Sequence, residues 1–243
     1  MLIERCLCGS DSWTQIAMKG KLVLASCLNC GTKWLVTHKT AESFEKWYAS
    51  GDYHDDVHRH PGCVAYAERY ASDFVAAQKR LERYADRLPL LFAPGRLEPV
   101  RMLDVGAAEG AFVDAARERG HLAIGLEPDE RFAREHVLRG TIATAPLELN
   151  TYDLVTYHDV IEHVADPLTE IRSAASLLDA TGCIVIEVPD VHVKEGEKHY
   201  KAEHLWYFTL LSLADLVHDA GLEATAFDYP IMGKLAVFAC RPR

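Results

Sequence analysis

The stretch Met102-Leu-Asp-Val-Gly-Ala-Ala-Glu-Gly-Ala-Phe112 decides the fold of this chain. Its apolar start predicts a strand that ends near Asp104. The glycines Gly106 and Gly110 predict a tight turn, and the run after them predicts a helix. Glycine lets a backbone come close to a ligand, and a helix start offers N–H groups without partners. The stretch therefore predicts a strand, a turn and a helix that together hold a nucleotide-like ligand.

A second apolar segment, Leu122 to Glu127, ends in a carboxylate. A carboxylate at the end of the second strand can accept hydrogen bonds from both hydroxyls of a ribose. The alternative role of Glu127 is a charge that favours the N-terminus of the next helix. Its place at a strand end favours ribose binding. The turn reads D-x-G-x-x-x-G, which differs from the G-x-G-x-x-G of the dinucleotide fingerprint.

On these residues the chain resembles the class I S-adenosylmethionine (SAM)-dependent methyltransferases. Their first motif is an acidic residue followed by a Gly-x-Gly-x-Gly turn, and an acidic residue ends their second strand. The sequence matches at Asp104, Gly106, Gly110 and Glu127, and it has Ala108 at the middle glycine. The small methyl group of Ala108 is expected to be tolerated. The resemblance covers about residues 100–240 and extends weakly, through paired cysteines, to a bacterial branch that carries an N-terminal zinc ribbon.

The pattern after Arg101 alternates strands with helices, which predicts a parallel sheet covered on both faces. We expect an α/β, Rossmann-like fold with a seven-stranded, mostly parallel sheet and a C-terminal antiparallel hairpin, as the resemblance also implies. The expected strands are 101–105, 122–127, 141–144, 152–157, 182–188, 222–228 and 234–240. The expected helices are 110–119, 129–139, 167–179 and 209–220, preceded by a long helix within 63–91.

Ligands of open α/β sheets bind at the carboxyl ends of the strands. The resemblance implies that the residues of the glycine turn meet the amino-acid end of SAM, that Glu127 holds the ribose and that the residue after it lies beside the adenosine. The residues assigned to SAM in this way are Asp104, Gly106, Ala107, Gly110, Phe112, Glu127, Pro128, His158 and Asp159.

The segment from Tyr157 to Pro167, YHDVIEHVADP, follows the fourth strand and lines donor and acceptor in this family. Its sequence resembles that of the corresponding segment in the branch that includes quinone-precursor and sugar methyltransferases. His163 is the leading candidate for the catalytic base because imidazole titrates near neutrality. The alternative is a hydrogen-bonded scaffold residue. Asp159, Glu162, His163 and His204 also resemble a set that binds a divalent metal in some relatives, although Asp159 is shorter than the usual glutamate.

The segment Lys201 to Thr209, KAEHLWYFT, resembles a part of bacterial methyltransferases that often act on nucleotide-linked sugars or saccharides. His204 is assigned to acid/base chemistry here. Its aromatic residues could stack on a sugar ring, but core packing before a helix capped by Thr209 is the favoured interpretation.

The first part of the chain carries two cysteine pairs, each followed by glycine: Cys6-Leu-Cys8-Gly9 and Cys27-Leu-Asn-Cys30-Gly31. Two such turns joined by a hairpin are typical of a zinc ribbon with four thiolate ligands. The first pair is one residue short of the usual spacing, so buried cysteines or a redox pair stay as alternatives. A structural zinc is expected, because so small a segment has little core. The expected division is a ribbon at 1–40, a connector and helix at 41–99 and a methyltransferase domain at 100–243, with the histidine-rich part of the connector as a solvated loop or lid.

The amino-acid composition argues against some classes of binding partner. The net charge is −10 and the pI is near 5.6, which argues against a general nucleic-acid surface. No apolar run approaches the roughly 18 residues of a membrane span, and the N-terminus does not resemble a signal peptide. We therefore expect a cytoplasmic SAM-dependent methyltransferase that acts on a small polar molecule, either a nucleotide sugar or saccharide intermediate, or a phenolic or quinone-like metabolite. A non-catalytic SAM-binding or zinc-ribbon adaptor is the remaining alternative. The sequence leaves the accepting atom and the oligomeric state open.

Overall fold

The computed structural model describes residues 6–19, 22–36, 41–50, 52, 66–93, 96–190, 201, 203–229 and 233–242. The histidine-rich part of the connector, expected as a solvated loop or lid, lies outside these residues except for Asp52. The strands are β1 Trp13–Lys19, β2 Leu22–Cys27, β3 Lys33–Val36, β4 Arg101–Val105, β5 Leu122–Glu127, β6 Val137–Arg139, β7 Tyr152–His158, β8 Leu178–Pro189, β9 Trp206–Tyr207, β10 Glu223–Asp228 and β11 Lys234–Cys240. The helices are α1 Ala41–Ala49, α3 Tyr66–Arg87, α4 Ala111–Glu118, α5 Pro167–Leu177 and α6 Leu210–Asp219, with short 3-10 turns η1 Glu130–Phe132 and η2 Ile161–His163.

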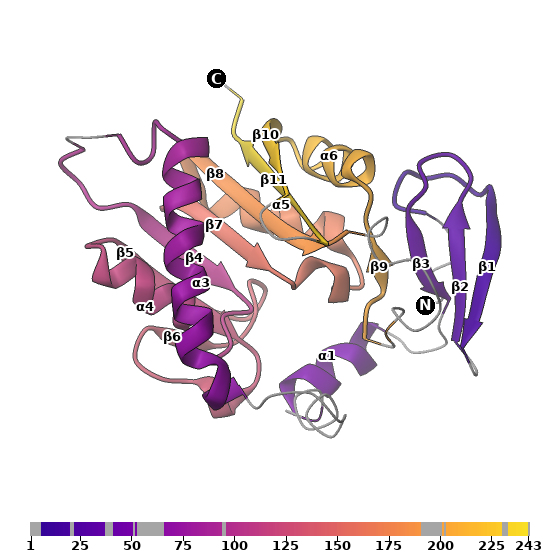
Figure 1. The fold of residues 1–243 in the computed structure, drawn as a ribbon, viewed down its shortest axis with the longest axis horizontal. Coiled ribbons are helices and arrows are strands. Elements are labelled where there is room, and N and C mark those ends of the chain that lie inside the picture. The colour runs from indigo at the N-terminus through magenta and orange to yellow at the C-terminus, as the bar shows by residue number, and fades with distance from the viewer. Residues whose placement is uncertain are drawn as a thin grey trace. The chain divides into compact units, whose positions relative to one another are not determined.

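The larger sheet has the strand order β10-β11-β8-β7-β4-β5-β6 (Figure 1). Strand β4 pairs in parallel with β5 and β7, and β10 pairs antiparallel with β11. The inner strands are buried on both faces, since β4 is buried from Met102 to Val105 and β7 is buried from Tyr152 to Tyr157. The expected seven-stranded, mostly parallel sheet with an antiparallel hairpin is confirmed.

A smaller sheet has the order β1-β2-β3-β9 (Figure 1). Three of its strands come from the cysteine-rich N-terminal part, as the pattern predicts. The fourth strand, β9, comes from the far end of the chain, and no sequence pattern predicted this pairing.

The chain divides into two compact units. One comprises Met1–Phe44, His158–Ala175 and Val185–Pro242, and the other is essentially Glu45–Tyr157 with Ser176–Ile184. The three-part domain division expected from the sequence stays a prediction. Among the described residues, no helix has the length and the apolar character that crossing a membrane requires.

The long helix α3 packs against α4 within its unit. Its buried face carries Ala77, Leu81 and Tyr84, which recur at helical spacing, and the ring of Tyr84 lies 6.0 Å from that of Phe112. The pattern therefore predicted this helix well. It fixes the start of α4, which is the helix that follows the glycine turn.

The prediction of a helix at 129–139 is wrong. The strand expected at 141–144 lies earlier in the chain, at Val137–Arg139. The chain forms only the short turn η1 and then strand β6. The side chain of Asp129 accepts the backbone N–H of Arg131 and caps the start of η1, which ends after Phe132. The N–H of Arg134 and the N–H of Val137 then bond to each other's carbonyl oxygens, which closes a reversal in place of a helix.

Candidate functional site

The glycine turn, residues Asp104–Gly110, connects β4 to α4. Gly106 and Gly110 have φ of 73° and 79°, which are left-handed values that favour glycine. Ala108 is left-handed as well, with φ of 44°. An L-residue in this region costs about 1–2 kcal/mol, so the methyl group at the position of the middle glycine is accommodated with strain.

The side chain of Arg134 forms hydrogen bonds to the glycine turn and to helix α4, which follows it. Its Nε donates to the carbonyl oxygen of Glu109 at 2.9 Å, and its Nη2 donates to Asp114 Oδ2 at 2.6 Å. A Cβ at Gly110 would lie 2.4 Å from Nη2 of Arg134 and 2.7 Å from Val137, so a side chain there would collide with both. Sequence reasoning missed Arg134 because it lay inside a helix that does not form.

Asp104 lies at the carboxyl end of β4 with only 4% of its surface exposed. The hydroxyl of Thr156, on the neighbouring strand β7, donates to Asp104 Oδ1 at 2.7 Å. This bond orients the carboxylate. An ionised carboxylate can accept further hydrogen bonds, including those of an ammonium group.

Glu127 ends β5 and is 6% exposed. Its Oε1 accepts the N–H of Asp129 at 3.1 Å, and its Oε2 accepts the N–H of Ala108 at 3.1 Å. Burial raises the pKa of Glu127 to about 7, and these two amides oppose the rise. The carboxylate therefore ties the second strand to the glycine turn and keeps lone pairs for further donors.

The other residues assigned to SAM have different surroundings. Ala107 is 8% exposed, and Phe112 is buried against Tyr84, so the ring of Phe112 serves the contact between α3 and α4. Pro128 is half-buried between Glu127 and the start of η1. One oxygen of Glu109, Oε1, is buried without a hydrogen-bond partner in the described residues. Burial raises the pKa of this glutamate, which the sequence did not single out.

A second group of polar side chains, Glu162, His163 and His204, is called the histidine cluster below. One ligand atom from each lies within 4.8 Å of the others. The two imidazole rings are 4.7 Å apart in an edge-on arrangement. The sequence assigned both histidines to catalysis, and the structure brings them together although they are far apart in the chain.

The surroundings of His163 fix its tautomer. Its Nδ1 lies 2.8 Å from the carbonyl oxygen of Glu203. A carbonyl oxygen can only accept, so Nδ1 carries the proton and Nε2 is the unprotonated nitrogen. Burial lowers the pKa of His163 to about 4. The ring is therefore neutral near pH 7 and can accept a proton, or coordinate a metal, through Nε2.

Glu162 is 1% exposed, and neither oxygen of its carboxylate has a hydrogen-bond partner in the described part of the chain. Its Oε1 lies 3.9 Å from His163 Nε2. Burial raises its pKa well above the ordinary value, and repulsion from Asp159 adds to this rise. A buried carboxyl group with no donor must be neutral or lie beside a cation. Glu162 was noted in the sequence only as part of the metal-like set.

Asp159 follows the end of β7 in a left-handed conformation, with φ of 58°. Its N–H donates to the carbonyl oxygen of Glu187 at 2.9 Å, and its carboxylate pairs with Lys234 at the start of β11. His158, the last residue of β7, is half-buried. Nothing in the sequence indicated that Lys234 lies next to this motif.

The cysteines Cys6, Cys8, Cys27 and Cys30 form a separate cluster, in which the four sulfur atoms lie within 4.8 Å of one another. The Sγ atoms of Cys6 and Cys30 are 3.4 Å apart, and those of Cys8 and Cys27 are 3.6 Å apart. Four thiolates placed tetrahedrally at about 2.3 Å from a zinc ion have sulfur atoms about 3.8 Å apart. The cluster therefore has the dimensions that zinc requires.

Both cysteine turns close in the same manner despite their different spacing. The N–H of Gly9 donates to the carbonyl oxygen of Cys6 at 2.9 Å, and the N–H of Gly31 donates to that of Cys27 at 3.1 Å. Both glycines have φ of 75°. The shorter first pair thus closes a turn of four residues where the second closes one of five, which explains how C-x-C serves in place of C-x-x-C.

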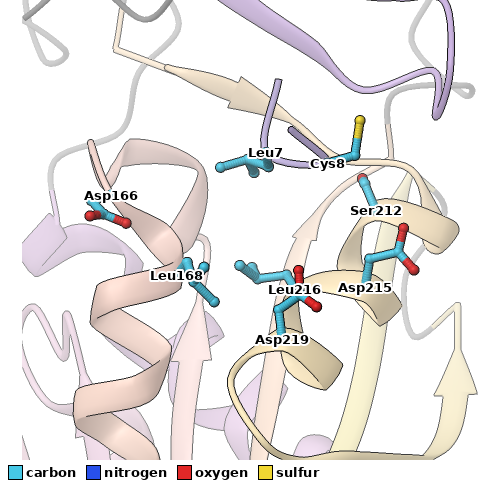
Figure 2. A pocket seen from close by; sticks show the side chains of 8 residues that line it. All are labelled: Leu7, Cys8, Asp166, Leu168, Ser212, Asp215, Leu216 and Asp219. Carbon is cyan, nitrogen blue, oxygen red and sulfur yellow. The ribbon is translucent and has the colours of Figure 1, made fainter. Parts of the chain in front are cut away.

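Two cavities are lined by residues outside the glycine turn and the histidine cluster. A cavity of about 140 Å³ is lined by Leu7 and Cys8 of the first cysteine turn and by side chains of α5 and α6, including the carboxylates of Asp215 and Asp219 (Figure 2). A wider one of about 500 Å³ in the other unit includes Leu81 and His121 in its lining. Neither contains a residue of the histidine cluster or of the glycine turn, so neither is assigned to the chemistry below.

Comparison with known proteins identifies the family. A family model described as "Methyltransferase domain" matches residues 76–226, which is more than half of the chain. The chain belongs to the SAM-dependent methyltransferase family. The match includes the glycine turn, Glu127 and the histidine cluster, so the enzyme class that the sequence predicted is confirmed.

Curated relatives match a shorter region. The ubiquinone biosynthesis O-methyltransferase of Vibrio campbellii is 34% identical over an alignment of 108 residues that covers 39% of this chain and 46% of that protein. The corresponding enzyme of Vibrio cholerae is 37% identical over 108 residues, with 39% of this chain and 44% of that protein covered. The methyltransferase thus spans less than half the length of these relatives.

Solved structures share the fold. The 1,6-didemethyltoxoflavin-N1-methyltransferase of Burkholderia thailandensis, solved with S-adenosylhomocysteine (SAH), has a TM-score of 0.64 at 14% identity and covers 94% of this chain and 99% of its own. The magnesium protoporphyrin IX methyltransferase of Synechocystis PCC 6803, solved with SAM, has a TM-score of 0.55 at 15% identity, with 85% and 100% covered. At these identities the likeness shows the fold alone.

Proposed function

We propose that the enzyme transfers the methyl group of SAM to a hydroxyl oxygen of a small polar acceptor, of the nucleotide-sugar or saccharide class. One observation carries the proposal: His163 is a buried, neutral imidazole whose Nδ1 donates to the carbonyl oxygen of Glu203, so that Nε2 is the unprotonated nitrogen. In the proposed step, the acceptor hydroxyl gives its proton to Nε2 while the oxygen lone pair attacks the methyl carbon. The C–S bond breaks, its electron pair stays on sulfur, and SAH leaves.

The donor is assigned to the glycine turn and the ends of β4 and β5. Asp104 would accept the ammonium group of the methionine part, and Glu127 would accept the ribose hydroxyls with its remaining lone pairs. Gly106, Ala107, Gly110, Phe112, Pro128, His158 and Asp159 complete the assignment. The support for it is that both carboxylates are buried and already oriented by neighbouring donors.

A negatively charged acceptor is supported by two lysines close to the histidine cluster. Lys234 pairs with Asp159, and Lys201 is 57% exposed and lies 3.7 Å from Glu203. Both lysines lower the pKa of Glu162, so their charge is felt at this site. A diphosphate can be held by such ammonium groups, which act as point charges.

A second candidate is metal-assisted O-methylation of a phenolic or quinone-like metabolite. It is favoured by the likeness to ubiquinone O-methyltransferases and by the composition of the histidine cluster. A divalent cation would fit beside Glu162, whose oxygens accept no hydrogen bond from the described residues, with His163 Nε2 and His204 as further ligands. Such an ion would lower the pKa of the acceptor hydroxyl. The carboxylate of Asp159 is paired with Lys234 instead and is not counted as a ligand.

We also propose that the cysteine cluster holds one structural zinc. Four thiolates leave no open coordination position, so the ion would stabilise the small sheet and take no part in chemistry. The reduced cysteine cluster agrees with a cytoplasmic setting, whereas the disulfide-bonded state of Cys183 and Cys240 does not, so the cytoplasmic setting stays a prediction. Elemental analysis of the purified protein is expected to find about one zinc per chain, and a metal-free preparation that keeps its fold would contradict this assignment.

An acceptor screen tests the proposed function. The enzyme is incubated with SAM and a panel of nucleotide sugars, saccharides, catechols and quinone precursors, and products are read as a mass increase of one methyl replacing one hydrogen. Methylation of sugars supports the first candidate, and methylation of catechols that EDTA abolishes while the ribbon keeps its zinc supports the second. SAH binding without turnover on any acceptor would favour a non-catalytic module.

A further inference from the structure

The small sheet is not a separate appendage of its unit, because the segment that carries His204 completes it. Strand β3 pairs antiparallel with β9, with Lys33 opposite Tyr207 and Trp34 opposite Trp206. The N–H of Leu35 donates to the carbonyl oxygen of Leu205 at 2.9 Å. Figure 1 shows β9 beside β3 at the edge of this sheet. The residues from Glu203 to Thr209 are called the bridging segment below.

The cysteine cluster itself contacts the bridging segment. The hydroxyl of Thr209 donates to the carbonyl oxygen of Cys30 at 3.3 Å. A Cβ on Gly31 would lie only 3.5 Å from the methyl group of Thr209. Trp34 is fully buried, and its ring lies 6.5 Å from that of Trp206. The second cysteine turn and β3 therefore hold both the end and the middle of this segment.

The other edge of the bridging segment contacts the histidine cluster. The N–H of Leu205 donates to the carbonyl oxygen of Glu162 at 2.9 Å, and Trp206 Nε1 donates to that of Val164 at 2.9 Å. The carbonyl oxygen of Glu203 accepts the Nδ1 proton of His163. The segment thus bonds to the cysteine ribbon on one edge and to η2 on the other, and it carries His204 itself.

We propose that the cysteine ribbon is a positioning element of the acceptor site, and that Thr209 and Trp206 are positioning residues that transmit its order to His163 and His204. The proposal rests on the proposed zinc and on the proposed role of His163. It goes beyond both, because it makes the geometry of the reacting group depend on an ion that is remote from the reaction.

The short length of β9 gives the physical reason. A strand of two residues has too few hydrogen bonds to persist without a neighbouring strand. Its neighbour β3 belongs to a small sheet whose stability depends on its metal. Loss of zinc should therefore free β3, then β9, and then the carbonyl oxygen of Glu203 that fixes the tautomer of His163.

The test reads the His163 tautomer directly, so it needs no acceptor. Full-length, zinc-loaded protein is labelled with ¹⁵N in its histidines, and His163 is assigned with the variant His163→Gln. We expect the ¹⁵N signals of an imidazole that is protonated at Nδ1 and unprotonated at Nε2. After zinc is removed with a chelator, that signal should change to the averaged pattern of a free imidazole, while SAH affinity stays within about twofold.

Three variants separate this coupling from a loss of fold. Thr209→Val removes the bond to Cys30 together with the cap of α6, Ser212→Ala weakens the cap alone, and Thr209→Ser keeps both. We expect a changed His163 signal in Thr209→Val and an unchanged one in the other two. Leu28→Ala, at a side chain in the second cysteine turn that is 67% exposed, is the matched surface control.

The outcomes distinguish the three claims. A zinc-loaded chain whose His163 signal survives both zinc removal and Thr209→Val overturns the positioning role and leaves the proposed zinc intact. A chain that contains no zinc refutes the zinc proposal, and Thr209→Val then decides the coupling alone. A coupled His163 whose replacement leaves turnover unchanged refutes the proposed base and keeps the coupling.

Discussion

The glycine turn and the histidine cluster belong to different units and are constructed in different ways. The turn comes from one continuous stretch and relies on backbone N–H groups and two buried carboxylates, Asp104 and Glu127. The cluster comes from segments far apart in the chain, and the segment that carries His204 continues into β9, which pairs with β3 of the cysteine ribbon. A compact local motif fits a donor that is the same in every reaction of the family, whereas an assembled site can differ from one acceptor to another.

The largest effect is expected at the cluster. Replacing His163 with Gln should lower turnover by roughly 10²- to 10⁴-fold, which is the usual contribution of a positioned base. SAH affinity should stay within about twofold, because the proposed ammonium and ribose contacts are made by Asp104 and Glu127 and not by His163. Steady-state rates on the acceptor found in the screen, with SAH binding measured in parallel, check this. Full turnover would show that His163 is a scaffold residue.

The next largest effect is expected at Glu127. Glu127→Ala removes an acceptor for the ribose hydroxyls and the partner of the Ala108 amide, and hydrogen bonds to charged groups contribute about 1.5–3 kcal/mol each. SAH binding should weaken by roughly 10- to 1,000-fold. Filter binding of radiolabelled SAM measures this, with Glu130→Ala as a control at an exposed glutamate close by. Equal losses in both variants would argue against ribose binding.

The pH dependence of donor binding should be smaller and should come from the same residue. The folded-state pKa of Glu127 is raised to about 7, and ribose hydroxyls bind best to the ionised form. Affinity for SAH should therefore fall as pH drops below 7, approaching about tenfold per pH unit. Titrations between pH 8 and 5.5 check this. Glu127→Gln should give a flat profile over the same range, and a slope that persists in this variant assigns the effect to another group.

The same raised pKa has a consequence for stability in the absence of ligand. A carboxyl group whose pKa is higher in the folded state binds protons preferentially when folded. Its contribution is present below the unfolded value near 4.5 and is lost as pH rises through about 7. Glu127→Gln should therefore gain stability relative to the wild type as pH increases from 5 to 8. Denaturant titrations at both pH values measure the difference.

The smallest effect is expected at Ala108. Glycine would relieve the left-handed strain, although it also increases the entropy of the unfolded chain. Ala108→Gly should therefore change the free energy of unfolding by less than about 1 kcal/mol, in the stabilising direction. Ala107→Gly is the matched control, because Ala107 is buried and does not have a positive φ, and it should destabilise by about 0.5–1 kcal/mol. A stabilised Ala107→Gly would show that backbone strain is not the cause.

The sequence predicted most of the local features and few of the long-range ones. The glycine turn, β4, β5, α3 and the two cysteine turns follow from periodicity, glycine positions and spacing, all of which act over a few residues. Three other features depend on tertiary contacts. They are the pairing of β9 with β3, the ion pair between Asp159 and Lys234, and the hydrogen bonds from Arg134 to the glycine turn. The failure of the expected helix at 129–139 has the same cause, because the tight reversal at Arg134 and Val137 outweighs helical propensity.

If the two regions have separate roles, the glycine turn holds SAM independently of the histidine cluster. Calorimetric titration of SAH into the wild type, Glu127→Ala and His163→Gln tests this most directly. We predict saturable binding to the wild type and to His163→Gln with similar affinities, and a large loss in Glu127→Ala. Absence of binding to the wild type at millimolar SAH, or loss in His163→Gln with retention in Glu127→Ala, would contradict the account.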